Sequence, residues 1–173
     1  MKTIRALLCA ASLVAVAPLQ AAPPPSAAQF DSFVREGGRH CATASSKACF
    51  ARGFGFADRD GDGLLSLEEA RAVHGALRDW TLANRDQLAE PDRRGLAVGL
   101  LVVQLVGLEA IFGSYDENGD GRLSRAELQA DVRLDERPLP VLVRDPDAVD
   151  WRSLRARLGP AGALLEDIMP RGS

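Results

Sequence analysis

Oxygen-bearing side chains recur at alternate positions in two twelve-residue segments, which run from 58 to 69 and from 116 to 127. The first segment reads DRDGDGLLSLEE and the second reads DENGDGRLSRAE. Each has an acid or an amide at its first, third and fifth positions, a glycine at its sixth and a glutamate at its twelfth. Calcium takes about six to eight hard oxygen ligands at roughly 2.3–2.6 Å, and a short flexible loop can supply them. Both segments therefore predict a metal site that favours calcium.

Each segment also contains the pattern of a helix cap, which offers a purely structural interpretation. Ser66 and Glu69 form one capping-box pattern, and Ser124 and Glu127 form the other. A cap requires only the serine and the glutamate, so it does not explain three oxygen-bearing residues before the glycine. The complete pattern favours metal binding over capping alone.

The two segments resemble the calcium loops of the EF-hand superfamily, and the chain resembles exported bacterial proteins with EF-hand domains. In the first loop, the resemblance implies binding through Asp58, Asp60, Asp62, the backbone carbonyl of Leu64, Ser66 (directly or through a water) and both carboxylate oxygens of Glu69. In the second loop, it implies Asp116, Asn118, Asp120, the carbonyl of Arg122, Ser124 and Glu127. It also implies two bound calcium ions and a short antiparallel β-contact in which Leu65 and Leu123 join the loops.

The two loops differ in charge. The first offers four carboxylates, whereas the second offers three carboxylates and an amide. Metal binding removes the repulsion between clustered carboxylates, so the charge count predicts tighter binding at the first loop. Magnesium is disfavoured because it requires strict octahedral geometry, and a glutamate at the twelfth position suits the larger ion.

The first residues of the chain have the composition of a secretory signal peptide. Lys2 and Arg5 precede an apolar run at 6–16, and Ala21 or Ala22 provides a small residue for cleavage. We expect a signal peptide at 1–21 and a periplasmic or secreted protein. An alternative is a lipoprotein anchor at Cys9, for which the preceding apolar segment is too short.

The remaining cysteines, Cys41 and Cys49, are expected to form a disulfide in an exported protein. A continuous helix would hold them about 12 Å apart, whereas a disulfide needs Cα atoms within about 7 Å. The chain is therefore expected to bend at 43–46. The alternatives are free thiols, or a zinc site with His40, which would fall short of four ligands.

We expect an all-α fold with two paired EF-hands, an elongated helical hairpin between them and further helical segments at both ends. The expected domains are the signal peptide, a proline-rich spacer with an N-terminal helix at 22–46, the hands at 47–89 and 90–132, and a C-terminal extension at 133–173. The expected helices cover 27–36, 47–57, 66–89, 93–115, 124–132 and 147–158, with a last turn or two at 160–169 and an extended segment at 138–143. The two loops start 58 residues apart, farther than in typical EF-hand pairs, which is a departure from the usual compact arrangement. We expect the two intervening helices to be extended into a long hairpin that turns at 90–92, where Glu-Pro-Asp breaks the helical pattern.

The segment from 96 to 112 is strongly apolar, and a membrane span is one interpretation. The run is slightly short and carries Glu109, so a buried core helix is favoured. The formal net charge is −3, and no basic stripe indicates nucleic acid binding.

Three functions are compatible with calcium binding. The first is a calcium-responsive module that binds an unknown protein partner, the second is a protein in which calcium stabilises the fold or is buffered, and the third is a calcium-supported enzyme. The third is the weakest because no nucleophile elbow, zinc motif or phosphate loop is present, and we expect no catalytic residues. Beyond the signal peptide, Met169 is the sole methionine, which argues against a methionine-rich groove for many targets.

Overall fold

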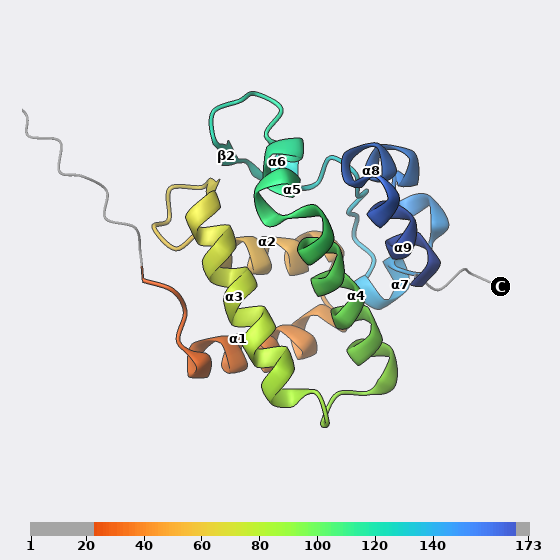
Figure 1. The fold of residues 1–173 in the computed structure, drawn as a ribbon. Coiled ribbons are helices and arrows are strands. Elements are labelled where there is room, and N and C mark those ends of the chain that lie inside the picture. The colour runs from red at the N-terminus through yellow and green to blue at the C-terminus, as the bar shows by residue number, and fades with distance from the viewer. Residues whose placement is uncertain (1–22, 169–173) are drawn as a thin grey trace, which may run out of the picture.

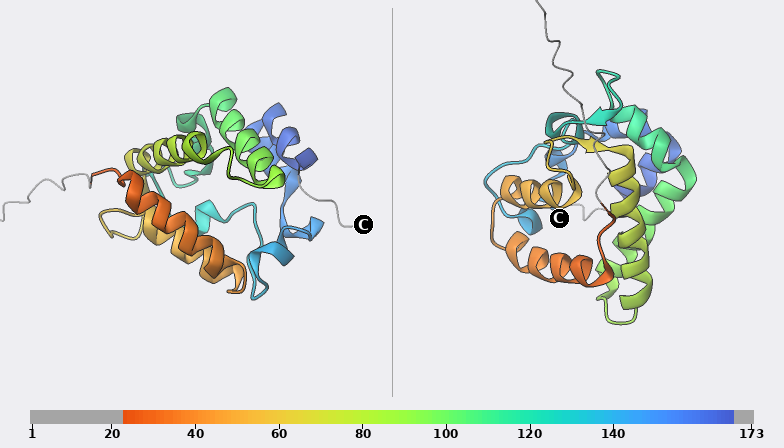
Figure 2. Two further views of the ribbon diagram at one scale, coloured as in Figure 1. Left: turned by 90° about the horizontal axis from the view of Figure 1, so that it is seen from below. Right: turned by 90° about the vertical axis from the view of Figure 1, so that its left-hand side faces the viewer.

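The computed structural model describes residues 23–168, so the predicted signal peptide, with Cys9, and residues 169–173 lie outside the description. The described chain is mostly helical and contains a two-stranded sheet (Figures 1 and 2), which confirms the all-α prediction. In chain order the elements are α1 (Ala27–Cys41), α2 (Ser46–Ala57), β1 (Leu65–Ser66), α3 (Leu67–Asn84), α4 (Glu90–Val106), α5 (Leu108–Tyr115), β2 (Arg122–Leu123), α6 (Arg125–Leu128), α7 (Leu139–Leu142), the 3-10 turn η1 (Pro146–Ala148), α8 (Trp151–Leu158) and α9 (Pro160–Ile168).

Two helix–loop–helix units share the small sheet. Helices α2 and α3 flank the first acidic loop, and helices α5 and α6 flank the second. Strands β1 and β2 pair antiparallel, with Leu65 opposite Leu123 and Ser66 opposite Arg122, which confirms the predicted β-contact. The core of the pair consists of one phenylalanine from each entering helix and the two strand leucines: Phe54, Phe112, Leu65 and Leu123.

The prediction of a single helix at 93–115 is wrong. The chain breaks at Gly107 into α4 and α5, which are bent by 87° relative to each other. Gly107 has a φ of 91°, a conformation that glycine adopts without strain, and its N–H donates to the carbonyl of Val103 at 2.9 Å to close α4. Within residues 23–168 no single helix is long and apolar enough to cross a membrane, although α4 and α5 together would be. Only α5 enters the second loop, and α4 is an additional helix between the two units.

The predicted hairpin between the units is formed by α3 and α4 (Figure 1), but its turn lies elsewhere. Helix α3 ends at Asn84, five residues before the predicted end at Ala89, so Leu88 does not extend its apolar face. The turn occupies 85–89, because Pro91 lies in the first turn of α4, where proline favours a helix start.

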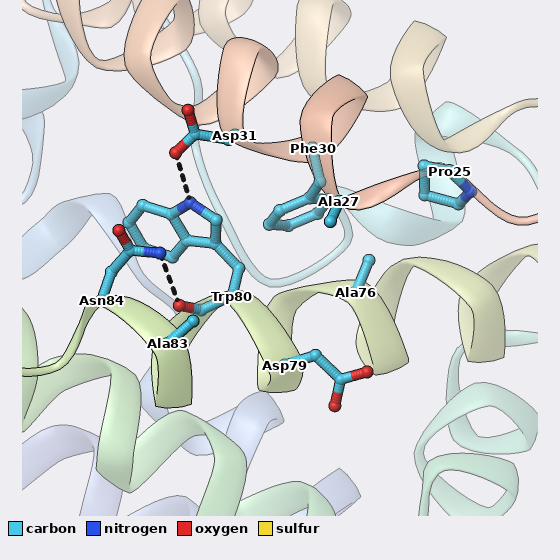
Figure 3. Close-up of a pocket in the computed structure, with 9 residues that line it drawn as sticks. All are labelled: Pro25, Ala27, Phe30, Asp31, Ala76, Asp79, Trp80, Ala83 and Asn84. Carbon is cyan, nitrogen blue, oxygen red and sulfur yellow. Dashed lines mark hydrogen bonds between the residues drawn. The ribbon is translucent and has the colours of Figure 1, made fainter.

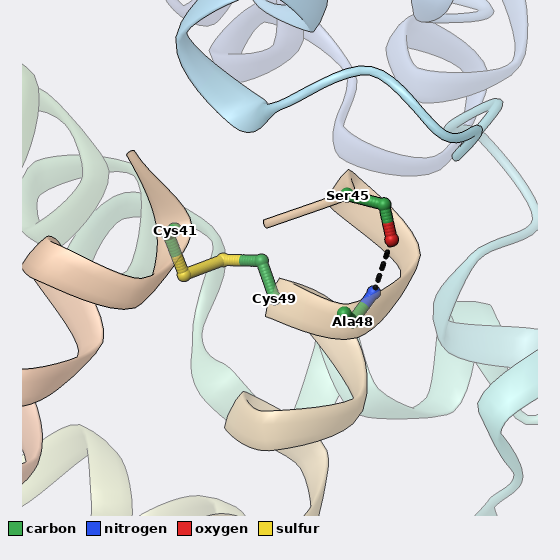
Figure 4. Close-up of a disulfide and its surroundings, with 4 residues drawn as sticks. All are labelled: Cys41, Ser45, Ala48 and Cys49. Carbon is green, nitrogen blue, oxygen red and sulfur yellow. Dashed lines mark hydrogen bonds between the residues drawn. A yellow bond between two sulfur atoms is a disulfide. The ribbon is translucent and has the colours of Figure 1, made fainter. Parts of the chain in front are cut away.

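The N-terminal helix and the disulfide support the first unit. Helix α1 continues through two glycines to Cys41, whereas the prediction ended it at Glu36. Packing against α2 offsets the low helix propensity of those glycines. Cys41 and Cys49 form a disulfide with Cα atoms 5.1 Å apart (Figure 4), and the expected bend separates α1 from α2.

Helix α1 also packs against α3 around aromatic side chains. Phe30 is buried, and the indole Nε1 of Trp80 donates to Oδ1 of Asp31 at 3.0 Å (Figure 3). A cavity of about 340 Å³ lies beside this contact. These contacts attach α1 to the helix that leaves the first loop.

The end of the second unit departs from the prediction. The helix predicted at 124–132 is reduced to the single turn of α6. Beyond it, Val132 pairs with Val149 in an isolated β-bridge, and the N–H of Arg133 donates to the carbonyl of Ala148 at 2.8 Å. Extended pairing with the C-terminal extension therefore replaces the last helical turns.

The C-terminal extension is more helical than predicted. The expected extended segment at 138–143 contains α7, because Pro140 lies in the first helical turn, where its missing N–H costs no hydrogen bond. The helix predicted from 147 starts at Trp151, after the side chain of Asp150 caps it. Helix α9 packs against α4 and α8, and the three helices bury one apolar residue each: Val102, Leu158 and Ala161.

Candidate calcium sites

Backbone N–H groups of the first loop point at its own carboxylates. Asp58 ends α2, and its Oδ2 accepts from the N–H of Gly63 at 3.0 Å. The N–H of Asp62 donates to Asp60 Oδ1 at 3.1 Å, and that of Leu64 donates to Asp62 Oδ1 at 2.9 Å. Gly63 has a φ of 85°, which explains the glycine at the sixth position. The alternating acids thus accept the backbone hydrogen bonds that hold the loop in its folded conformation.

Glu69 closes the first loop from the start of α3. Its Oε1 accepts from the N–H groups of Arg59 and Asp60 at 2.7 and 3.2 Å. Its Oε2 accepts from the N–H and hydroxyl of Ser66 at 2.8 and 2.7 Å. Burial raises the pKa of Glu69, but the hydrogen bonds from Ser66, Arg59 and Asp60 outweigh it and hold the pKa below its ordinary value. The carboxylate therefore stays charged while it is 6% exposed.

Three of the predicted ligands of the first loop come together. One carboxylate oxygen from each of Asp58, Asp60 and Glu69 lies within 4.8 Å of the others. Oδ1 of Asp58 is buried and has no hydrogen-bond partner within the described part of the chain. A buried anionic oxygen without a partner is costly, whereas a cation bound among these oxygens would satisfy it. The residues present therefore fit a hard cation such as calcium.

Asp62 and Ser66 are arranged differently from these three ligands. The Oδ2 of Asp62 pairs with the guanidinium of Arg122, which belongs to the second loop. The hydroxyl of Ser66 donates to Glu69 and caps α3. The assignment of these two residues as ligands remains a prediction.

The second loop repeats the same hydrogen-bonding plan. Oδ2 of Asp116 accepts from the N–H of Gly121 at 2.9 Å, as Asp58 does from Gly63. Oε1 of Glu127 accepts from the N–H of Glu117 at 3.1 Å, and its Oε2 accepts from Ser124. Hydrogen bonds from the backbone N–H and hydroxyl of Ser124 lower the pKa of Glu127. Both loops thus place a charged glutamate across the loop from the first acid.

Hydrogen bonds of the Asn118 side-chain amide join residues in the middle of the second loop. Nδ2 of Asn118 donates to Oδ2 of Asp120 at 2.9 Å, and the N–H of Asp120 donates back to Oδ1 of Asn118 at 3.0 Å. The first loop has an acid in place of Asn118, and an ionised acid cannot donate in this way.

A buried polar network beside the second loop was not predicted. Asp131 is 2% exposed and accepts from the hydroxyl of Tyr115 at 2.7 Å. Arg157 belongs to α8. Its Nε lies 3.2 Å from Asp131 Oδ2, and its Nη2 lies 2.5 Å from Glu117 Oε1. It also donates to the carbonyl of Ser114 and covers the Tyr115 ring. No local pattern could indicate it, because Arg157 is 26 residues from Asp131 and 40 residues from Glu117.

Both loops match a model of a known protein family, described as EF hand, at residues 51–74 and 108–132. These two segments are EF-hand motifs. Each match includes residues of an entering helix, the whole loop and residues of the helix that leaves it, so α2 with α3 and α5 with α6 are the two EF-hands. No curated protein and no solved structure matches the chain. The two EF-hands indicate calcium binding, and this family is usually non-enzymatic.

Proposed function

We propose that this protein binds two calcium ions, one in each EF-hand loop. The observation that carries the proposal is the cluster of Asp58, Asp60 and Glu69, in which Asp58 has a buried carboxylate oxygen without a hydrogen-bond partner in the described chain, together with the same hydrogen-bonding plan in the second loop. The residues that would hold the two ions are the two predicted ligand sets given above. The calcium would satisfy oxygens that the protein alone leaves in mutual repulsion.

We further propose that calcium binding controls a binding surface between α3 and α4. A groove of about 570 Å³ lies there, and its apolar walls include Leu82, Leu100 and Val103. Helix α3 leaves the first loop, and Leu108 at the start of α5 also lines the groove, so a change in either loop can reach its walls. Leu82 is 62% exposed and lines this groove, so its side chain is accessible to a partner.

The chemistry of the groove suggests what the partner carries. His74 and Arg78 line the groove, and its described lining contains no acidic residue. An amphipathic helix with apolar anchors and a carboxylate would complement both the walls and the charge. We propose such a segment of another protein as the partner.

A purely structural role for calcium is the second candidate, and the C-terminal extension favours it. Helix α9 already covers part of α4, and α8 packs against α5 of the second hand, so part of the apolar surface around the hands is paired within the chain. A site whose dissociation constant is a hundredfold below the free calcium concentration adds about 2.7 kcal/mol to the free energy of unfolding. Calcium would then stabilise a single fold without changing the binding surface.

Export remains part of the proposal. The Cys41–Cys49 disulfide supports an oxidising compartment, because cytosolic thiols are normally kept reduced. The positively charged and then apolar N-terminal sequence supports a secretory signal. Fractionation of the source cells, with N-terminal sequencing of the recovered protein, tests both points.

A dye titration separates the two roles. Metal-free protein is titrated with calcium while the fluorescence of the apolar dye ANS and the melting temperature are followed. The binding module predicts that calcium raises dye binding and that Leu82→Gln abolishes the rise, whereas the matched control Leu164→Gln, on α9 and 40% exposed, keeps it. A higher melting temperature without added dye binding supports the structural role. If millimolar calcium changes neither signal and releases no heat, both proposals are wrong.

A further inference from the structure

Arg122 connects the two calcium loops through its side chain as well as its backbone. The strand register places Arg122 opposite Ser66, at the end of the first loop. From there its guanidinium reaches back and pairs with Oδ2 of Asp62. Both side chains are partly shielded from solvent, with 35% of Arg122 and 26% of Asp62 exposed. A residue of the second hand thus neutralises a predicted calcium ligand of the first.

The pair leaves Asp62 without a free oxygen. Its Oδ1 accepts from the N–H of Leu64 at 2.9 Å, and its Oδ2 is held by Arg122. Asp58, by contrast, has a buried oxygen with no partner in the described chain. The cluster of converging oxygens contains Asp58, Asp60 and Glu69 and does not contain Asp62. The fifth-position ligand is therefore held outside the set that is ready for a cation.

Among the described residues, the second loop receives no equivalent cation from the first. The residue that corresponds to Arg122 in the first loop is Leu64, which carries no charge. The fifth-position acid of the second loop, Asp120, accepts from Asn118 and from the N–H of Arg122, which are groups of its own loop. The contact between the loops is one-sided.

We propose that Arg122 sets the calcium affinity of the first loop by competing with the metal for Asp62. The inference rests on calcium binding by the first loop, as proposed above. Calcium must either displace the guanidinium or accept a ligand whose charge is already neutralised, and both outcomes weaken binding. The first loop then has three predicted ligand carboxylates without a cation partner, as the second does among the described residues, although its sequence offers four.

The test isolates the first loop by placing all variants in a Glu127→Gln background, and it measures calcium affinity by calorimetry. Arg122→Gln keeps the backbone carbonyl of the second loop and removes the competing cation. We expect it to tighten binding about two- to fivefold, the range that corresponds to a partly exposed ion pair. Arg122→Lys keeps the positive charge and should stay near the parent value.

Arg125→Gln is the matched control. Arg125 lies in the same hand, and its guanidinium covers the ring of Phe54 at 4.8 Å from the centroid, so its removal lowers the net charge equally without freeing Asp62. An equal gain in both glutamine variants would reduce the effect to general electrostatics and overturn the proposal. Unchanged or weaker binding by Arg122→Gln would also overturn it.

Melting temperatures provide a second readout that distinguishes competition from a structural role. Without metal, Arg122→Gln should melt slightly lower, because Asp62 loses its partner, yet its rise on adding calcium should be larger than that of the parent. An equal rise in both would contradict competition. Absence of calcium heat in the wild-type protein and in every variant would instead remove the proposed calcium function itself, and the inference with it.

Discussion

The two EF-hands of this protein share one loop design but are supported in different ways. The first is flanked by α2 and α3, of 12 and 18 residues, and α1 packs against both helices. The second is flanked by α5 and α6, of 8 and 4 residues. A helix of one turn cannot hold a loop by its own hydrogen bonds, because short helices are marginal in water.

The support of the second hand comes from the C-terminal extension. The segment after α6 pairs with residues just before α8, and Arg157 ties Asp131, Glu117 and the end of α5 together. All of these extension residues lie beyond the family match, which ends at 132. The EF-hand motif therefore specifies how each loop folds. The stability of each hand depends on the elements packed around it, which are α1 for the first hand and the C-terminal extension for the second.

The largest effect should follow from removing the cation of that network. Arg157→Met leaves Asp131 buried without its charged partner, which typically costs about 3 kcal/mol in the free energy of unfolding. Chemical denaturation should register this loss, and calcium titration should show that the second site weakens more than the first.

The matched control for this change lies in the same helix. Arg155 pairs with Glu166, but its side chain is 45% exposed, so Arg155→Met should cost less than about 1 kcal/mol. Equal losses from the two arginines would mean that the C-terminal extension does not support the second hand in particular.

A smaller effect, directed at the other hand, should follow from opening the disulfide. The bridge closes a short loop between residues eight apart in sequence, and the double change Cys41→Ser with Cys49→Ser should cost about 2–3 kcal/mol. Thermal melting of the variant, and of the wild type with and without reductant, measures it. If the disulfide supports the first hand, the calcium affinity of the first loop should fall and that of the second should stay constant. A loss of affinity in the second loop alone would contradict this assignment.

The sequence predicted the parts of this fold that depend on local spacing. The loop glycines, the capping glutamates Glu69 and Glu127 and the break between Cys41 and Cys49 follow from patterns within a dozen residues. The structure contains the glycines and the caps where the patterns placed them, and the break lies at 42–45, one residue earlier than predicted. The identity of all the metal ligands stays a prediction.

Other features depend on contacts between distant residues or on how the chain packs. The bend at Gly107 was missed because the apolar pattern continues through it, and glycine alone does not say whether a helix will break. The pairing of Arg122 with Asp62 joins residues 60 apart, and no periodicity reveals it. The charge count that predicts tighter binding at the first loop treats all four carboxylates as free, whereas Asp62 pairs with Arg122.

Each loop is proposed to bind one calcium ion through its twelfth-position glutamate. The direct measurement is the number of ions bound per chain, determined by calorimetry on the wild type, Glu69→Gln and Glu127→Gln, with the exposed neighbour Glu68→Gln as control. We expect two ions for the wild type and for Glu68→Gln, and one for each of the other variants. Fewer than two ions in the wild type, or two ions retained after either ligand change, would contradict the claim.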